Sequence, residues 1–188
     1  MASTGSIQLQ QGGNAALSDL MPIVGTVVVG FGWRLIEGHG PATELVPSAV
    51  VCDAGGRALS DEHLVFFNQL ASPEGTVTYV DGGDEEQLEL DLASVPDNVD
   101  KIVFVVYADP DLRKPGNFSS VRSAYFRIAD RTGTELVRYD ISGGSGAEVT
   151  AMIFGEVYRH RGAWKVRAVG QGYATGLKGV ANDFGVSI

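Results

Sequence analysis

Apolar and polar residues alternate at every second position along much of the chain, which is the pattern of β-strands that turn one face to a core. The clearest stretch runs from Glu148 to Tyr173. Arg161-Gly162 can form its turn, because glycine supplies the positive φ that a tight hairpin requires. We therefore predict a long β-hairpin, and Gly155 in its first strand indicates a bulge or a close backbone neighbour.

Shorter stretches of the same character predict the remaining strands. They cover residues 6–10, 23–33, 48–52, 64–67, 76–80, 88–92, 101–108, 124–128 and 136–141. The run 101–108 is apolar at almost every position, so this strand should be covered on both faces or lie at the centre of a sheet. We expect one helical turn in residues 93–99 and the only convincing helix in 174–182. A loose tail is expected at 1–5, and loops at 36–43, 109–117 and 143–146.

Many short strands, frequent turns and almost no helix are typical of a β-sandwich or a β-barrel. The 188 residues are enough for one substantial core. The sequence contains no internal repeat, low-complexity segment or linker. We therefore expect a mainly all-β fold in a single domain, residues 1–188.

The chain is acidic, with 23 acidic and 14 basic residues and a formal net charge of −9, which argues against a nucleic-acid partner. The charge is uneven, because residues 1–121 carry net −12 and residues 122–188 carry net +3. Two differently charged solvated faces explain this pattern. The alternatives are attraction of a cation by the first part, and contact of the second part with an acidic partner or another copy of the chain.

Cys52 is the only cysteine in the sequence, which excludes an internal disulfide and fits a cytoplasmic protein. It lies in an apolar run and is expected to be an inert core thiol. The sequence shows no signal peptide, and no apolar run approaches the roughly 18 residues of a membrane span. We therefore expect no membrane partner.

Residues 81–100 carry eight carboxylates and no basic residue. The first of these surround Gly82-Gly83, a pair that lets the loop fold tightly so that oxygens converge. Calcium requires six to eight oxygen ligands, and Asp61 and Asn68 could add ligands from neighbouring loops. A complete EF-hand pattern is absent, so a solvated acidic turn is the alternative.

Catalytic patterns are weak in this sequence. The three histidines lie far apart, and none has a zinc-site spacing with Cys52. Ser60 and His63 belong to one contiguous turn, so we expect their side chains to point apart, and no nucleophile elbow is present. The basic residues around the hairpin turn (Arg159, Arg161, Lys165 and Arg167) are expected to form a solvated strand face, with an acidic partner as the alternative. We therefore predict that the protein is not an enzyme.

Five motifs follow one another along the chain: SDEHLVFFNQLASPEGTV, DKIVFVVYA, RSAYFRIADRTGTELVRYDIS, TAMIFGEVYRHRGAWKVRAVGQGYATGL and VANDFGVSI. In this order they resemble the TerD family of bacterial tellurite-resistance and calcium-binding stress proteins. The resemblance covers most of residues 20 to 188. It implies a β-sandwich of two antiparallel or mixed sheets with one short C-terminal helix and helical turns. It implies a calcium ion but no settled catalytic reaction.

The resemblance also implies that this calcium site is reduced. The family's Asp-Leu-Asp-Ala-Ser segment corresponds to residues 44–48, where Glu44 can still bind a metal but Val46 cannot. The Asn pair corresponds to Asn68-Gln69, and the Gly/Asp-rich loop has shrunk to residues 81–86. Arg34 replaces an Asp of the family pattern and adds a positive charge. We therefore predict a weakened or lost site, formed by Asp84 and Glu85 with help from Asp81, Asn68, Asp61 and Glu44.

The leading hypothesis is a non-enzymatic, cytoplasmic TerD-like stress-response and tellurium-resistance protein. Its weakened calcium site would tune an interaction module for protein partners, with self-association as a further option. A metal-free interaction scaffold of the same fold is the second hypothesis. An enzyme that acts on a small substrate is the third.

Overall fold

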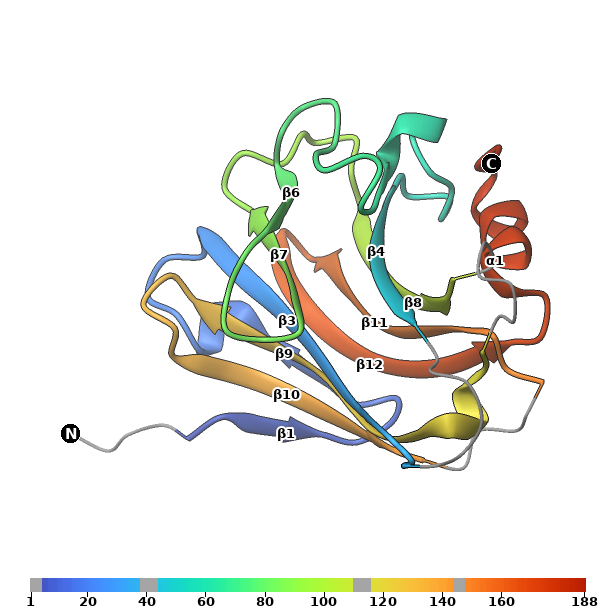
Figure 1. Ribbon diagram of the computed structural model, residues 1–188. Helices are drawn as coiled ribbons and strands as arrows, with labels where there is room; N and C mark the ends of the chain where they lie inside the picture. Colours follow the sequence, from blue (N-terminus) through green and yellow to red (C-terminus); the bar gives the residue numbers. More distant parts are fainter. Residues whose placement is uncertain (1–4, 38–43, 110–115, 144–147) are drawn as a thin grey trace.

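Two six-stranded sheets pack face to face in the computed structural model, which describes residues 5–37, 44–109, 116–143 and 148–188 (Figure 1). This arrangement confirms the predicted β-sandwich with one short C-terminal helix. The loops predicted at 36–43, 109–117 and 143–146 and the tail at 1–5 fall largely outside the described residues. The described residues of these loops, 36–37, 116–117 and 143, do not belong to any strand.

The first sheet, sheet A, has the strand order β1-β10-β9-β3-β7-β6. Its strands are β1 (Ile7–Leu9), β3 (Thr26–Leu35), β6 (Val77–Val80), β7 (Glu86–Asp91), β9 (Val121–Asp130) and β10 (Glu135–Ser142). All neighbours are antiparallel except β1 and β10, which run parallel. The sheet is therefore mixed, with the predicted strand at 6–10 on its edge.

The second sheet, sheet B, is antiparallel and has the order β2-β12-β11-β8-β4-β5. Its strands are β2 (Asn14–Ala16), β4 (Leu45–Cys52), β5 (Leu64–Val65), β8 (Lys101–Ala108), β11 (Ala151–His160) and β12 (Ala163–Tyr173). The helix α1 spans Gly176–Phe184 and ends at Gly185. Three 3-10 turns complete the described elements: η1 (Leu17–Asp19), η2 (Asp61–His63) and η3 (Phe118–Ser120).

Phenylalanines from both sheets form the centre of the core. The ring of Phe31 on β3 lies 6.0 Å from that of Phe104 on β8, and Phe104 lies 6.0 Å from Phe126 on β9. Phe154 on β11 packs against Phe31 at 6.4 Å. All four side chains are fully buried. Burial of aromatic rings at these separations is a main source of the stability of such a sandwich.

The predicted hairpin is confirmed as β11 and β12, with Arg161 and Gly162 both at positive φ in the turn. The expectation for Gly155 is also confirmed. The strand register shifts between Ile153 and Gly155, and the Phe126 ring of the opposite sheet lies directly against Gly155. Glycine at this position lets the two sheets approach each other.

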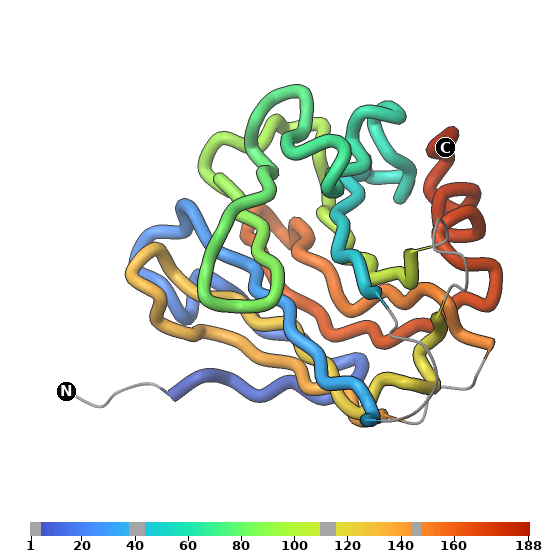
Figure 2. Tube along the Cα trace, in the orientation of Figure 1, coloured from blue at the N-terminus to red at the C-terminus, as the bar shows by residue number. Residues whose placement is uncertain are grey.

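The two outer faces differ. Helix α1 covers the outer face of sheet B. There its apolar residues pack with Val103 and Val105 of β8 in a second buried cluster. This confirms that β8 is covered on both faces. The outer face of sheet A is crossed instead by the loop between β6 and β7, which passes in front of β3 (Figure 2).

Two local predictions were wrong. Residues 93–99 form turns instead of a helical turn. The Arg159 guanidinium donates hydrogen bonds to the carbonyl oxygens of Val95, Pro96 and Val99, and the backbone bond from the Val99 amide to the Pro96 carbonyl closes a single turn that is not continued as a helix. The strand β2 was missed, because Asn-Ala-Ala has little β-propensity and forms a strand only by pairing with β12. No helix within the described residues has the length and apolar character needed to cross a membrane.

Replacing Gly155 with alanine should destabilise the protein by about 2 kcal/mol, because the new methyl group would overlap the Phe126 ring and lie 2.6 Å from the Arg167 carbonyl oxygen. Urea unfolding followed by tryptophan fluorescence measures this loss. Gly25→Ala is the matched control, since nothing lies within 4 Å of its Cβ position. Equal midpoints for the two variants would contradict the close sheet contact.

Candidate functional site

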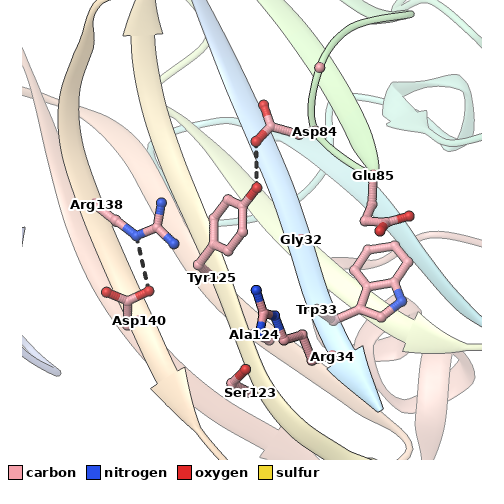
Figure 3. A pocket seen from close by; sticks show the side chains of 11 residues that line it. Gly32, Trp33, Arg34, Asp84, Glu85, Ser123, Ala124, Tyr125, Arg138 and Asp140 are labelled. Atoms are coloured by element: carbon pink, nitrogen blue, oxygen red, sulfur yellow. Dashed lines mark hydrogen bonds and ion pairs between the residues drawn. The ribbon is translucent and has the colours of Figure 1, made fainter.

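Two hollows lie beside the 81–86 loop. The first, here called the acidic hollow, has a volume of about 250 Å³. It is lined by Glu44, Leu45, Val46, Phe67, Tyr79, Glu86 and Asp109. The second, here called the arginine hollow, has a volume of about 380 Å³ on the outer face of sheet A. It is lined by Gly32, Trp33, Arg34, Gly83, Asp84, Glu85, Ser123, Ala124, Tyr125, Arg138 and Asp140 (Figure 3).

The acidic hollow is where the segments expected to hold calcium meet. Glu44 immediately precedes β4, Phe67 adjoins Asn68 in the turn after β5, and Glu86 begins β7. Burial and the nearby charges of Asp81 and Glu85 raise the pKa of Glu86 above its usual value. Negative charge is therefore crowded at this end of the loop, and a cation there would relieve it.

Asp84 points away from the acidic hollow and is bound to sheet A. The Arg127 guanidinium donates to both carboxylate oxygens, with Nη2–Oδ2 at 2.9 Å and Nε–Oδ1 at 3.0 Å. The Tyr125 hydroxyl donates to Oδ1 at 2.5 Å, and the Gln87 amide donates to Oδ2 at 2.6 Å. The Asp84 side chain is only 5% exposed. Its carboxylate thus has a full set of protein donors, which we call the Asp84 latch.

Two glycines of β3 make room for this latch. A Cβ atom at Gly30 would overlap the Asp84 carboxylate, and one at Gly32 would overlap the Tyr125 ring. In the strand register, Gly30 pairs with Arg127 on one side and Gln87 on the other. The carboxylate therefore lies in a trough between two of its donors.

The latch changes the acidity of its members. Burial alone would raise the pKa of Asp84, but hydrogen bonds from Arg127, Tyr125 and Gln87 outweigh burial and hold this pKa below its usual value. Burial and the bond to Asp84 raise the pKa of Tyr125 to about 12. The Asp84–Arg127 pair is therefore charged at neutral pH.

The six residues predicted to bind metal are divided among several places. Glu44 lines the acidic hollow, while Asp84 and Glu85 line the arginine hollow. Asp61 accepts a hydrogen bond from the Ser187 amide at 2.8 Å, near the chain's C-terminal residues. Asn68 and Asp81 are exposed. The site residues that sequence reasoning missed are Glu86 and Asp109 as lining groups and Arg127 as the partner of Asp84.

Calcium fits the acidic hollow in chemistry but not in ligand number. Glu44, Glu86 and Asp109 offer only oxygen donors, the kind that calcium prefers. Yet no group of three His, Cys, Asp or Glu side chains converges tightly enough to hold a metal ion within the described parts of the chain. Val46 contributes no oxygen from its side chain, and Asp84 is engaged elsewhere. The donors present suit a loosely held ion.

The arginine hollow lies on neighbouring, hydrogen-bonded strands of sheet A. The Tyr125 ring lies over Gly32, and the Arg138 guanidinium stacks on that ring at 4.0 Å from its centre. Arg138 also binds Asp140 at 3.0 Å and Glu135 at 3.3 Å. Figure 3 shows the Arg34 side chain extending into this hollow toward Tyr125, with Trp33 and Glu85 on the other side.

The prediction that Ser60 and His63 point apart was wrong. The Ser60 hydroxyl lies 2.7 Å from His63 Nδ1, and His63 Nε2 lies 2.9 Å from Glu74 Oε2. The 3-10 turn η2 places Ser60 and His63 three residues apart on one side, which a contiguous turn allows. His63 is buried and connects this turn with the Ser72–Gly75 turn, which gives it a structural role.

Other sequence predictions about reactive groups hold. Cys52 is fully buried, and burial raises the pKa of its thiol to about 12, so it is an inert core thiol. His160 is exposed. The basic residues of the hairpin are only partly a solvated face, because Arg167 binds Glu156 at 3.2 Å and Arg159 stacks on Trp164.

Asp84→Asn should lower the free energy of unfolding by about 3 kcal/mol, because it leaves the Arg127 guanidinium without its buried partner. Asp140→Asn removes an equal charge from the same face, but Asp140 is half-exposed and its pair with Arg138 should contribute less than about 1 kcal/mol. Chemical denaturation of both variants gives the comparison. Similar losses would show that the latch does not stabilise the fold.

The latch also predicts a dependence of stability on pH. Because the pKa of Asp84 is lower in the folded chain than the roughly 3.9 of an unfolded aspartate, its contribution is complete above that value. The contribution is lost as the pH falls through the folded pKa. Unfolding free energies measured from pH 6 to pH 2.5 should therefore fall less steeply for Asp84→Asn than for the natural chain. Parallel curves would contradict a charged Asp84.

Comparison with known proteins supports the resemblance found in the motifs. The TerD domain family matches residues 6–184. The tellurium resistance protein TerD of Serratia marcescens is 40% identical over 190 residues, which cover 97% of this chain and 98% of that protein. General stress protein 16U of Bacillus subtilis (strain 168) is 36% identical over 97% of this chain and 99% of that protein.

Solved structures support the fold independently. A homologue of the telluride resistance protein TerD, SCO6318 from Streptomyces coelicolor A3(2), superposes with a TM-score of 0.64 at 21% identity. The aligned parts cover 87% of this chain and 99% of that one. The protein of unknown function SAV2460 gives a TM-score of 0.66 at 23% identity over 88% of this chain and 99% of that one. With the family match and the 40% identity, these findings show that the chain belongs to the TerD family, whose relatives are named for tellurium resistance and general stress.

Proposed function

We propose that this chain is a non-enzymatic, cytoplasmic stress-response and tellurium-resistance protein that works as an interaction module. In this proposal the acidic hollow binds one calcium ion weakly, and the ion tunes which protein partner is preferred. The relatives' names support the stress and tellurium role. The observation that carries the calcium part is that Glu44, Glu86 and Asp109 all line one hollow.

The raised pKa of Glu86 supports a cation at this position. Burial and two neighbouring carboxylates disfavour its charged form. A bound divalent ion would offset the free-energy cost of charging Glu86. Because Glu86 is the first residue of β7, the core would not need to rearrange. Exposed Phe67 and Leu70 lie in the turn that borders the hollow, so a partner that contacts this end would bury apolar surface as well.

A metal-free scaffold of the same fold is the second candidate. The Asp84 latch favours it, because Arg127 already neutralises one carboxylate of the loop and fixes its position. In that case the loop would present the same surface with and without calcium. Calcium binding to the isolated protein separates the two candidates.

Calorimetric titration of metal-stripped protein should reveal one calcium ion with a dissociation constant of roughly 10⁻⁴ to 10⁻³ M, the range of weak calcium modules. Calcium at ten times that constant should add about 1.4 kcal/mol to the free energy of unfolding. Glu86→Gln should abolish the binding, whereas Glu89→Gln, which removes an equal charge from the same strand outside the hollow, should retain it.

Three results would count against this function. If no heat is measured at millimolar calcium, the metal-free scaffold is the remaining candidate. Sub-micromolar binding of more than one ion would show that the site is not weakened. Binding that survives Glu86→Gln would move the ion to another part of the protein.

A further inference from the structure

The arginine hollow contains a cation that has no ion-pair partner in the described parts of the chain. Arg34 on β3 is exposed and makes no ion pair among the described residues, although the chain carries an excess of acidic groups. The other arginines of this face are engaged, Arg127 by Asp84 and Arg138 by Asp140 and Glu135. With respect to residues 5–37, 44–109, 116–143 and 148–188, Arg34 therefore differs from Arg127 and Arg138 in having donors that no carboxylate occupies.

The strand register explains why Arg34 is left without a carboxylate. Arg34 pairs with Ser123 on β9, and Ser123 pairs with Ser142 on β10. The row of side chains across the sheet at this level thus consists of a guanidinium and two hydroxyls. By strand alternation all three project from the same outer face. Every group in this row can donate a hydrogen bond, and none is an anion.

The neighbouring carboxylates do not neutralise this row. Asp84 is 5% exposed and is held by Arg127, Tyr125 and Gln87. Asp140 accepts hydrogen bonds from Arg138 and from the Gln8 amide. The remaining lining carboxylate, Glu85, belongs to the loop beside Trp33, on the opposite side of the hollow from Ser123 in Figure 3.

The shape of the hollow leaves room for a ligand of a few atoms above this row. Its floor includes Gly32, which carries no side chain, and the backbone of Ala124, whose methyl group belongs to the core. The Tyr125 ring forms one wall, fixed over Gly32 by its bond to Asp84 and by the stacked Arg138. The latch therefore makes this wall rigid before any ligand arrives.

We propose that the arginine hollow is a binding site for a small oxyanion, held by the Arg34 guanidinium and the Ser123 hydroxyl. A planar guanidinium accepts two oxygens of a carboxylate or phosphate side by side, and a hydroxyl on the adjacent strand supplies a third donor. The site requires no calcium and is independent of the acidic hollow. The shared chemistry is an anionic group with two or more oxygens, carried by a carboxylic acid or by a phosphate.

Nuclear magnetic resonance of the full ¹⁵N-labelled chain tests this proposal. The probes are sodium phosphate and sodium acetate, each titrated at constant ionic strength with chloride as the balancing anion. The amides of Gly32 and Ser123 and the indole of Trp33 should shift and reach saturation with at least one probe. Saturation by phosphate alone identifies a phosphate site, saturation by acetate alone identifies a carboxylate site, and either result supports the proposal.

Arg34→Met is the decisive variant, and it should weaken the binding by about tenfold or more, because it removes a charged donor and keeps the aliphatic stem. Arg122→Met is the matched control. Arg122 is also exposed and shares a neighbouring hollow with Arg34, but it does not line the arginine hollow. Ser123→Ala should weaken the binding by a smaller factor, and the amide spectrum of each variant shows whether it is folded.

Three outcomes would overturn the proposal. The first is the absence of saturation with both probes. The second is unchanged binding in folded Arg34→Met. The third is an equal loss in Arg122→Met, which would place the anion in the neighbouring hollow or attribute the shifts to general electrostatic attraction. None of these outcomes bears on calcium binding, so the proposed function is tested separately by the calcium titration.

Discussion

The ion pair between Arg127 and Asp84 decides how the functional end of this protein is arranged. It holds an acidic loop against the outer face of sheet A, over a trough that two glycines of β3 leave open. A carboxylate that is 5% exposed needs compensation for the water it has lost, and three side chains supply it. The loop thereby separates the acidic hollow from a second hollow whose lining also includes Arg34 and Arg138.

This arrangement shows what the sequence could and could not predict. The hairpin of β11 and β12, the doubly covered β8 and the contact at Gly155 follow from alternation, apolar runs and the spacing of glycine. Such features depend on residues close together in the sequence. The strand β2 and the turns at 93–99 depend instead on distant partners, β12 and Arg159, and local propensity does not contain that information.

The site was predictable only in part, for the same reason. The motifs predicted a joint site for Glu44, Asn68 and the 81–86 loop, and one residue from each of these three segments, Glu44, Phe67 and Glu86, lines the acidic hollow. Sequence reasoning assigned Asp84 to the metal because it counted carboxylates in the loop. It could not see that Arg127, more than 40 residues away, takes both oxygens of Asp84. Gly30 and Gly32, two positions apart on β3, were the one signal in the sequence that other side chains pass close to this strand.

The latch also fixes the acidic loop through contacts within the chain itself. A calcium ion organises an acidic loop by neutralising carboxylates that would otherwise repel one another. Here a guanidinium performs that task for Asp84, with directional hydrogen bonds in place of an ion that must be captured from solution. Because Arg127 belongs to a central strand of sheet A, its position is fixed by the fold itself. This internal cation therefore holds the loop in place, and the crowding of negative charge around Glu86 is what an ion in the proposed calcium site would relieve.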